Sequence, residues 1–239
     1  MSDSFDGPAL PPPIIDDPGW SGDEASRTGP AWEQGGPWFQ RFAQTAQAAL
    51  LSPSLFFSTM RRTGGIGAPV TYGLLGTFLG GLAAGIYQFL LGTLLAGVNG
   101  GEAAREQAVL NAFSTGCIIV ILPLVTVLSL FINAGITHVM LLLLNGARRG
   151  FETTMRVAAY AHGSSAMLNL VPICGGPIGS VWALVIVIIG IARAHEIPTG
   201  KAAAAVLIPI AVCCVLVLVF YAAIAALVFG AVMAGTSHQ

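Results

Sequence analysis

The chain has few charged residues and none of the local motifs that mark the common catalytic sites. Only 9% of its 239 residues are charged, whereas soluble domains carry about 25%. No basic stripe suited to DNA or RNA is present, so nucleic-acid binding is excluded. No HExxH, GxSxG or Walker phosphate loop occurs. The sequence therefore predicts a protein that is not an enzyme and that holds no cofactor.

Cysteine is also scarce and follows no metal-binding pattern. No CxxC pair occurs, and no cysteine lies at a zinc-site distance from a histidine, so no metal site is predicted. Because free cysteine is usually buried, we expect these residues to be small packing residues. The four are Cys117, Cys174, Cys213 and Cys214. The first forty residues also lack the apolar core of a signal peptide, so the first apolar segment is expected to act as the insertion signal.

Apolar sequence is what the chain has in abundance, with a mean hydropathy of +0.79. A membrane core about 30 Å thick needs about 20 apolar helical residues. Four segments approach or exceed that length without an internal charge: Pro69–Val98, Phe113–Leu144, Ile178–Arg193 and Lys201–Met233. A fifth segment, Thr153–Val171, is more polar. The prediction is an all-α polytopic membrane protein with five transmembrane helices.

The distribution of positive charge supports five spans. Nine of the ten Lys and Arg residues fall on one side if the chain crosses five times from a cytoplasmic N-terminus. Only Arg105 lies outside, beside Glu102 and Glu106. Positive charge near span ends resists translocation, so this bias predicts a cytoplasmic N-terminus and an external C-terminus. A re-entrant or interfacial third segment is the alternative.

Three regions are predicted along the chain. Residues 1–36 are acidic and rich in Pro, Gly and Ser, which favours a disordered cytoplasmic tail. Residues 37–67 form an interfacial amphipathic region, in which Trp38, Phe42, Ala46 and Ala49 share a helical face. A helix packed on the loops is the alternative for this region. Residues 68–234 form the transmembrane domain.

Glycine is concentrated in the first span, where it lies in two stripes. Gly73, Gly76 and Gly80 share one face, and a second set, including Gly81 and Gly85, lies on an adjoining face. Glycines in lipid let helix backbones approach closely. We expect this span to pack against two neighbours, with homodimerisation through Gly76 and Gly80 as the alternative.

Polar residues form stripes on the second and third spans. An antiparallel hairpin would place Asn133 opposite Ser165, and Thr137 opposite His162. Hydrogen bonds between spans would satisfy such groups away from water. Two interpretations remain open: structural hydrogen bonding, or a polar track for a proton or small solute. The track would comprise Asn133, Thr137, His138, His162, Ser165 and Asn169.

The segment from Phe151 to Pro209 resembles the Ypt-interacting protein (Yip) domain family, in particular its bacterial members. Its pattern is an aromatic residue and Thr before R-V-x-A-Y, a Pro after the third span, a Trp in the fourth, then I-I-G-x-x-x-A-H and K-A-x-A-A-V-L-x-P. The matching residues are Phe151, Thr154, Arg156, Tyr160, Pro172, Trp182, Gly190, His195, Lys201 and Pro209. The resemblance covers roughly residues 50–232. One departure is that His162 and Gly163 stand where the family has Ala-Pro.

This resemblance implies a non-enzymatic five-span protein of the bacterial cytoplasmic membrane. Eukaryotic relatives act in membrane traffic and associate with Rab-type GTPases and with sister proteins. We expect a membrane-organising or partner-binding scaffold, with a small transporter or channel as the alternative. The expected partners are the lipid bilayer, a protein on the cytoplasmic face and a second copy of the chain. The candidate functional or family-motif residues are Arg148, Arg149, Arg156, Tyr160, Pro172, Gly190, His195 and Lys201.

Overall fold

The computed structural model describes residues 27–236, and within that range it contains helices and turns but no strand. The elements in chain order are η1 (Ala31–Glu33), α2 (Trp38–Leu51), α3 (Pro53–Thr59), α4 (Gly67–Asn99), α5 (Gly101–Leu143), α6 (Phe151–Ser165), η2 (Ala166–Leu170), α7 (Gly175–Ala194) and α8 (Thr199–Thr236). The all-α prediction is confirmed for this range. The prediction of disorder for residues 1–26 lies outside it.

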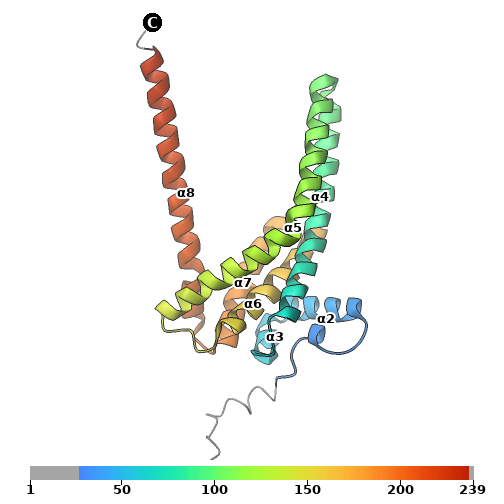
Figure 1. Ribbon diagram of the computed structural model, residues 1–239, viewed down its shortest axis with the longest axis vertical. Coiled ribbons are helices and arrows are strands. Elements are labelled where there is room, and N and C mark those ends of the chain that lie inside the picture. The colour runs from blue at the N-terminus through green and yellow to red at the C-terminus, as the bar shows by residue number, and fades with distance from the viewer. Residues whose placement is uncertain (1–26, 237–239) are drawn as a thin grey trace, which may run out of the picture.

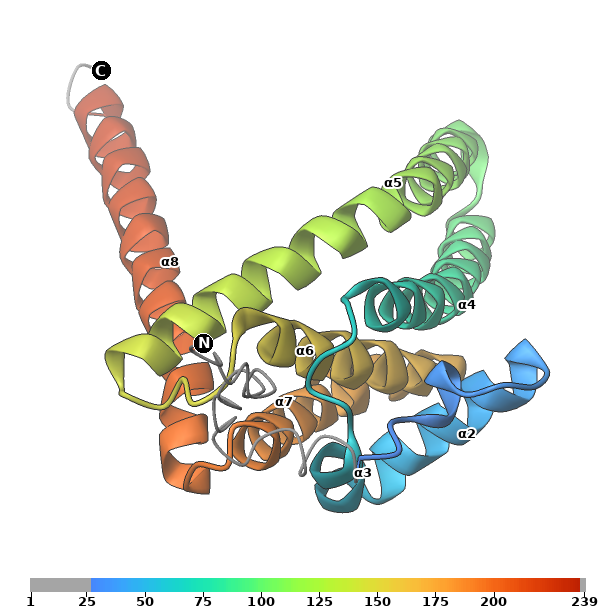
Figure 2. The ribbon, with the colours of Figure 1, turned by 60° about the horizontal axis from the view of Figure 1, so that its bottom comes forward.

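The helices form a packed base from which two arms extend (Figure 1). The base consists of η1, α2, α3, α6 and α7, the adjoining ends of α4, α5 and α8, and the turns between them. The arms are residues 86–125 of the α4–α5 hairpin and residues 208–229 of α8. Figure 2 shows α6 and α7 side by side within the base. Nearly all of the buried side chains belong to the base.

Four helices are long and apolar enough to cross a membrane. They are Gly67–Val98, Gly101–Leu143, Gly175–Ala194 and Thr199–Phe229. The third predicted span, Thr153–Val171, is instead built from the shorter α6 followed by η2. Most of α6 is buried among other helices. Its polar residues therefore face protein rather than lipid, which explains its weak hydropathy.

The prolines inside the second and fifth apolar segments do not break the helices. Pro123 lies within α5 and Pro209 within α8, and both helices are continuous. The turn between α4 and α5 is made by Gly100 and Gly101, whose φ values are +66° and +83°. Glycine suits this turn because it has no Cβ to clash at positive φ.

The two glycine stripes of α4 pack as the sequence predicts. A Cβ on Gly76 would lie 2.2 Å from the carbonyl oxygen of Gly163 in α6. On the other face, a Cβ on Gly81 would lie 2.5 Å from Leu122 in α5. The prediction that this span touches two neighbours is confirmed. The alternative of a homodimer through Gly76 and Gly80 is wrong, because that face is already covered within the chain.

The short amphipathic region forms two helices packed on the base. Phe42, Ala46 and Ala49 of α2 are buried, whereas Trp38 is 56% exposed at the helix start. The apolar face of α2 is therefore packed against the rest of the chain, as the alternative prediction for this region had it. α3 begins with Pro53 at its first turn, where the fixed φ of proline suits a helix start.

Two sequence-based expectations require correction. The predicted disordered tail extended to residue 36, but residues 27–34 are docked on the base and include η1. The cysteines were expected to be buried packing residues. All four are free and exposed: Cys117 in α5, Cys213 and Cys214 in α8, and Cys174 in the turn before α7.

Candidate functional site

The base encloses charged and polar side chains that soluble and membrane proteins rarely bury. Arg62 and Arg156 are each 1% exposed, and His195 is fully buried. Burying a charge is costly unless it is paired and hydrogen-bonded. The three residues come from the α3–α4 connection, from α6 and from the end of α7. Two clusters of partners satisfy them.

The first cluster surrounds Arg156. Its Nε donates a 2.8 Å hydrogen bond to the carbonyl oxygen of Arg61, and Nη1 donates to that of Gly65. Nη2 donates to Oε1 of Glu33, which also accepts a hydrogen bond from the Tyr160 hydroxyl. The cluster thus joins α6 to the α3–α4 connection and to η1. We call these residues the Arg156 cluster.

The second cluster surrounds Glu196, in the turn between α7 and α8. Its carboxylate accepts hydrogen bonds from Arg62 and, at 2.8 Å, from Arg149, and forms an ion pair with Arg27 at 3.6 Å. Arg148 donates to its carbonyl oxygen at 3.1 Å. Burial alone would raise the pKa of Glu196, but hydrogen bonds from Arg62 and Arg149 lower it below its usual value. The carboxylate is therefore held ionised.

His195 connects this cluster to α5 and α6 through a chain of hydrogen bonds. The backbone N–H of Arg149 donates to Nδ1 of His195 at 3.3 Å, so Nδ1 carries no proton. Nε2–H then donates to Thr154 Oγ1 at 3.0 Å, and that hydroxyl donates to Nδ1 of His138 at 2.9 Å. Burial, together with His138, Arg149 and Arg62, lowers the pKa of His195 to about 4. The ring is neutral, as this chain of donors requires.

The two clusters join separate connections of the chain into one surface. Arg62 belongs to the α3–α4 connection, Arg149 to the α5–α6 turn, and Glu196 to the α7–α8 turn. Because one carboxylate binds both arginines, these connections lie at the same end of the molecule. The base is thus held by side chains that are distant in sequence.

The sequence-predicted motif residues have different places in this structure. Arg148, Arg149, Arg156, Tyr160 and His195 belong to the two clusters. Lys201 caps the end of α5 by donating to the carbonyl oxygen of Asn145 at 3.3 Å. A Cβ on Gly190 would lie 2.6 Å from Val157, so Gly190 permits α7 to pack on α6. Pro172 lies away from the clusters, in the turn after η2.

Sequence reasoning missed the carboxylates that complete the clusters. Glu33 pairs with Arg156 across 123 positions, and it was assigned to a disordered tail. Glu196 was not predicted as a partner of the arginines. Its signal was the scarcity of acidic residues after position 36, because each such carboxylate beside an apolar core is a candidate partner for a buried arginine. No comparable signal marked Glu33 within the acidic tail.

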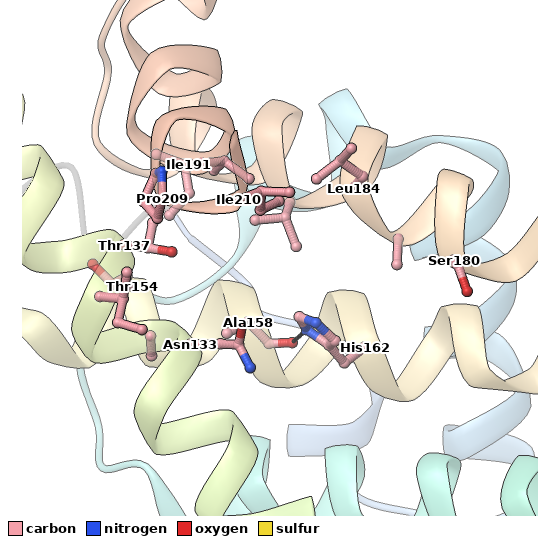
Figure 3. A pocket seen from close by; sticks show the side chains of 15 residues that line it. Asn133, Thr137, Thr154, Ala158, His162, Ser180, Leu184, Ile191, Pro209 and Ile210 are labelled. Carbon is pink, nitrogen blue, oxygen red and sulfur yellow. Dashed lines mark hydrogen bonds between the residues drawn. The ribbon is translucent and has the colours of Figure 1, made fainter. Parts of the chain in front are cut away.

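A cavity of about 250 Å³ lies among α5, α6, α7 and α8 (Figure 3). Asn133 and His162 point into it from α5 and α6. Leu184, Pro209 and Ile210 line the opposite side. Most of its polar side chains thus come from α5 and α6, whereas α7 and α8 contribute apolar ones apart from Ser180.

Two further cavities follow in series, each sharing lining residues with the one before it. One of about 320 Å³ shares His162 and Ser180 with it and is also lined by Ser165. Another, of about 530 Å³, shares Asn169 with the second. Five of the six residues of the predicted polar track line these cavities: Asn133, Thr137, His162, Ser165 and Asn169. None of the described residues that line the three cavities is charged.

The predicted pairing across the α5–α6 hairpin is wrong in register. His138 meets Thr154, eight residues before His162, the residue expected opposite its neighbour Thr137. Asn133 donates to the carbonyl oxygen of Ser129 in its own helix at 2.8 Å. Ser165 likewise donates to a carbonyl oxygen of α6. The polar stripes therefore line cavities rather than forming the expected pairs.

His162 stands where the first two cavities meet. Its Nδ1 lies 2.8 Å from the carbonyl oxygen of Ala158, which can only accept, so Nδ1 carries the proton. In the neutral ring Nε2 is then a hydrogen-bond acceptor. Across residues 27–236, no group of three or more His, Cys, Asp or Glu side chains is arranged to hold a metal ion.

Comparison with known proteins gives a match that covers both the base and the long apolar helices. The family model of the Yip1 domain matches residues 48–221, which run from α2 into α8. No curated protein and no solved structure matches the chain. Residues 27–34, which supply Glu33, precede the matched range. With its four long apolar helices, the chain is an integral membrane protein that belongs to the Yip1 domain family.

Proposed function

We propose that this protein is a non-enzymatic membrane scaffold whose base is the cytoplasmic face and binds a protein partner or organises lipid. The observation that carries the proposal is the joining of three connections by Glu196 and its arginines. A surface fixed in this way presents its exposed charges in a constant arrangement, which lowers the entropy cost of binding. The bacterial cytoplasmic membrane is the proposed location.

The proposed topology has five spans, with α6 and η2 together forming the third. At 1.5 Å per residue in α6 and about 2 Å in η2, the two extend about 32 Å, close to the thickness of the hydrocarbon core. The link between Arg149 and Glu196 places the start of α6 and the end of α7 at the same end. If α7 crosses the membrane, α6 and η2 must cross as well.

Reporter fusions test this topology. Fusions after Thr63, Gly150 and Thr199 are expected to report the cytoplasm. Fusions after Gly101, Gly176 and Gln239 are expected to report the outside. A cytoplasmic signal from the C-terminal fusion would overturn the five-span topology and place the base on the other side or remove one crossing.

The exposed arginines of the base test the scaffold function. Arg61 lies in the α3–α4 connection and Arg193 near the end of α7, and both are exposed. Replacing both with glutamine is expected to leave insertion and folding intact but to abolish the cellular phenotype and partner crosslinking. Arg105→Gln, at the exposed tip of the α4–α5 arm, is the matched control. Normal phenotype and crosslinking in the double variant would refute this role for the base.

A second candidate function is the passage of a small neutral solute. The observation that favours it is the series of three cavities lined by uncharged polar groups. Proteoliposomes are expected to take up a neutral solute such as glycerol faster than empty vesicles do. His162→Phe should block the junction and abolish the difference, whereas Cys213→Ser on the outer surface of α8 should not. Uptake equal to that of empty vesicles would eliminate this candidate.

A further inference from the structure

The carboxylate that satisfies Arg156 comes from outside the matched domain. Glu33 precedes the range matched to the Yip1 domain, which begins at residue 48. Its side chain is 9% exposed, and it covers Arg156 and Tyr160, which are almost completely buried. We call residues 27–34, which contain η1, the strap. The domain therefore presents a receptor for a carboxylate, and the strap fills it.

The neighbouring residue of the strap is recognised separately. Trp32 makes edge-on contacts with Phe42 and Tyr72, with ring centroids 6.2 and 5.7 Å apart. Its Nε1–H donates a 2.8 Å hydrogen bond to the carbonyl oxygen of Ala68, and the Arg41 guanidinium lies 5.5 Å from its ring centre. An aromatic slot with a polar acceptor thus lies beside the carboxylate receptor. Together the slot and the receptor bind two successive side chains, those of Trp32 and Glu33.

The receptor is held in place by the domain itself. Arg156 donates to the carbonyl oxygens of Arg61 and Gly65, and its Nη1 lies 3.6 Å from Glu152 on the same helix. Glu152 in turn accepts a 2.7 Å hydrogen bond from the N–H of Gly65. These contacts orient the guanidinium without Glu33. Preorganised groups of this kind bind a ligand at low entropic cost.

The strap joins α2 through two glycines that are surrounded by open space. Gly35 and Gly36 are exposed, and a Cβ at either position would have no neighbour within 4 Å. Gly36 has φ +120°, a conformation that glycine adopts easily. The contacts of this part of the chain end at Gln34, whose carbonyl oxygen accepts from Arg41. The strap can therefore lift about this glycine pair by breaking its bonds to Thr45, Arg41, Thr59 and Met60, while the backbone hydrogen bonds of α2 stay in place.

We propose that the Arg156–Tyr160 receptor and the Trp32 slot form a peptide-binding site for an aromatic residue followed by glutamate, with Trp32–Glu33 as its built-in competitor. The partner is a protein segment of that chemistry. This inference rests on the scaffold function proposed above and gives its base a specific docking mode. Because the competitor is tethered, it acts at an effective concentration of about millimolar. A partner peptide must therefore bind to the fraction of molecules in which the strap is lifted.

Direct binding to the purified full chain tests the site. The probe is a synthetic peptide of residues 28–36. The double substitution Trp32→Ala and Glu33→Ala empties the site, and this variant is expected to bind the peptide at least about tenfold more tightly than the wild type. A peptide with Glu33→Gln is the matched control and should bind weakly. No binding of the native peptide to the folded variant would overturn the proposal, whatever the cellular phenotype of the exposed-arginine variant.

Hydrogen exchange of the wild-type chain provides a test that does not depend on a variant folding. The Trp32 N–H donates to Thr45 Oγ1 at 2.8 Å, so its exchange reports lifting of the strap. Strap amides are expected to exchange faster than those in the middle of α6, and excess peptide should accelerate them further. Exchange as slow as in α6 and unchanged by peptide would show that the strap is a fixed part of the fold, and would refute the proposal.

Discussion

The base and the arms share the long helices α4, α5 and α8, yet they are held by different interactions. In the base, Arg62, Arg156 and His195 are buried and every one has partners on other segments. Across residues 208–229 of the α8 arm, by contrast, almost every side chain is exposed. Hydrogen bonds and charge pairs fix geometry because an unsatisfied buried partner is costly. The arms have few such contacts, so lipid or other chains must cover their apolar surface.

The largest difference in stability between a base variant and an arm variant is expected when the charge of Arg156 is removed. Arg156→Gln leaves Glu33 and Tyr160 without their cation in a buried site, at an expected cost of about 3–5 kcal/mol in the free energy of unfolding. The matched change in an arm, Arg105→Gln, should have no measurable effect. Thermal unfolding in detergent measures both. Equal unfolding midpoints for the two variants would contradict the assignment of Arg156 as a buried, paired charge that stabilises the base.

Acid should weaken the base and not the arms. The pKa of His195 is about 4 in the folded protein and 6.5 in the unfolded chain, so the unfolded chain binds the proton more tightly. The stabilisation is complete above pH 6.5 and is lost as the pH falls through 4, by at most about 3 kcal/mol. Protonation would also disrupt the bond from Arg149 and add a charge facing Arg62 and His138. Thermal unfolding measured between pH 7 and 4 should show this loss, and His195→Gln should reduce its slope.

Adding a methyl group to α4 should cost stability at the base end of this helix and not at its arm end. Gly76→Ala places Cβ 2.2 Å from a backbone oxygen of α6, and overpacking of this kind costs about 1–3 kcal/mol. Gly97→Ala, in the arm, has no atom within 4 Å of the new methyl group. It should be neutral or slightly stabilising. A loss of stability at Gly97 as large as that at Gly76 would mean that the arm is packed as tightly as the base.

The smallest expected effect comes from a single hydroxyl. The Tyr72 hydroxyl is 2.7 Å from that of Ser164, and both residues are buried. Tyr72→Phe should cost about 1–2 kcal/mol because Ser164 loses its partner. Tyr221→Phe in the α8 arm, where the side chain is 66% exposed, should not change the unfolding midpoint. A neutral Tyr72→Phe would show that Ser164 finds another partner.

Periodic features of the sequence were predictable, whereas contacts between distant residues were not. The glycines of α4 recur at helical spacing, so both packing faces could be assigned from sequence alone. The polar track residues were also found by spacing, and five of the six line neighbouring cavities. Their pairing was wrong because the turn from Asn145 to Gly150 and the tilt of α5 set the register, and neither appears in a periodic pattern.

Local patterns in the sequence were enough to predict a helical, apolar protein built around a glycine-rich first span. Hydropathy and helical spacing are local properties, and they do not depend on how the helices are arranged. Which carboxylate satisfies each buried arginine depends instead on the three-dimensional fold. It brought Glu33 to Arg156 and Glu196 to Arg62, because a buried charge is stabilised by whichever opposite charge the fold places beside it. The first of these pairings docks the N-terminal strap on the base.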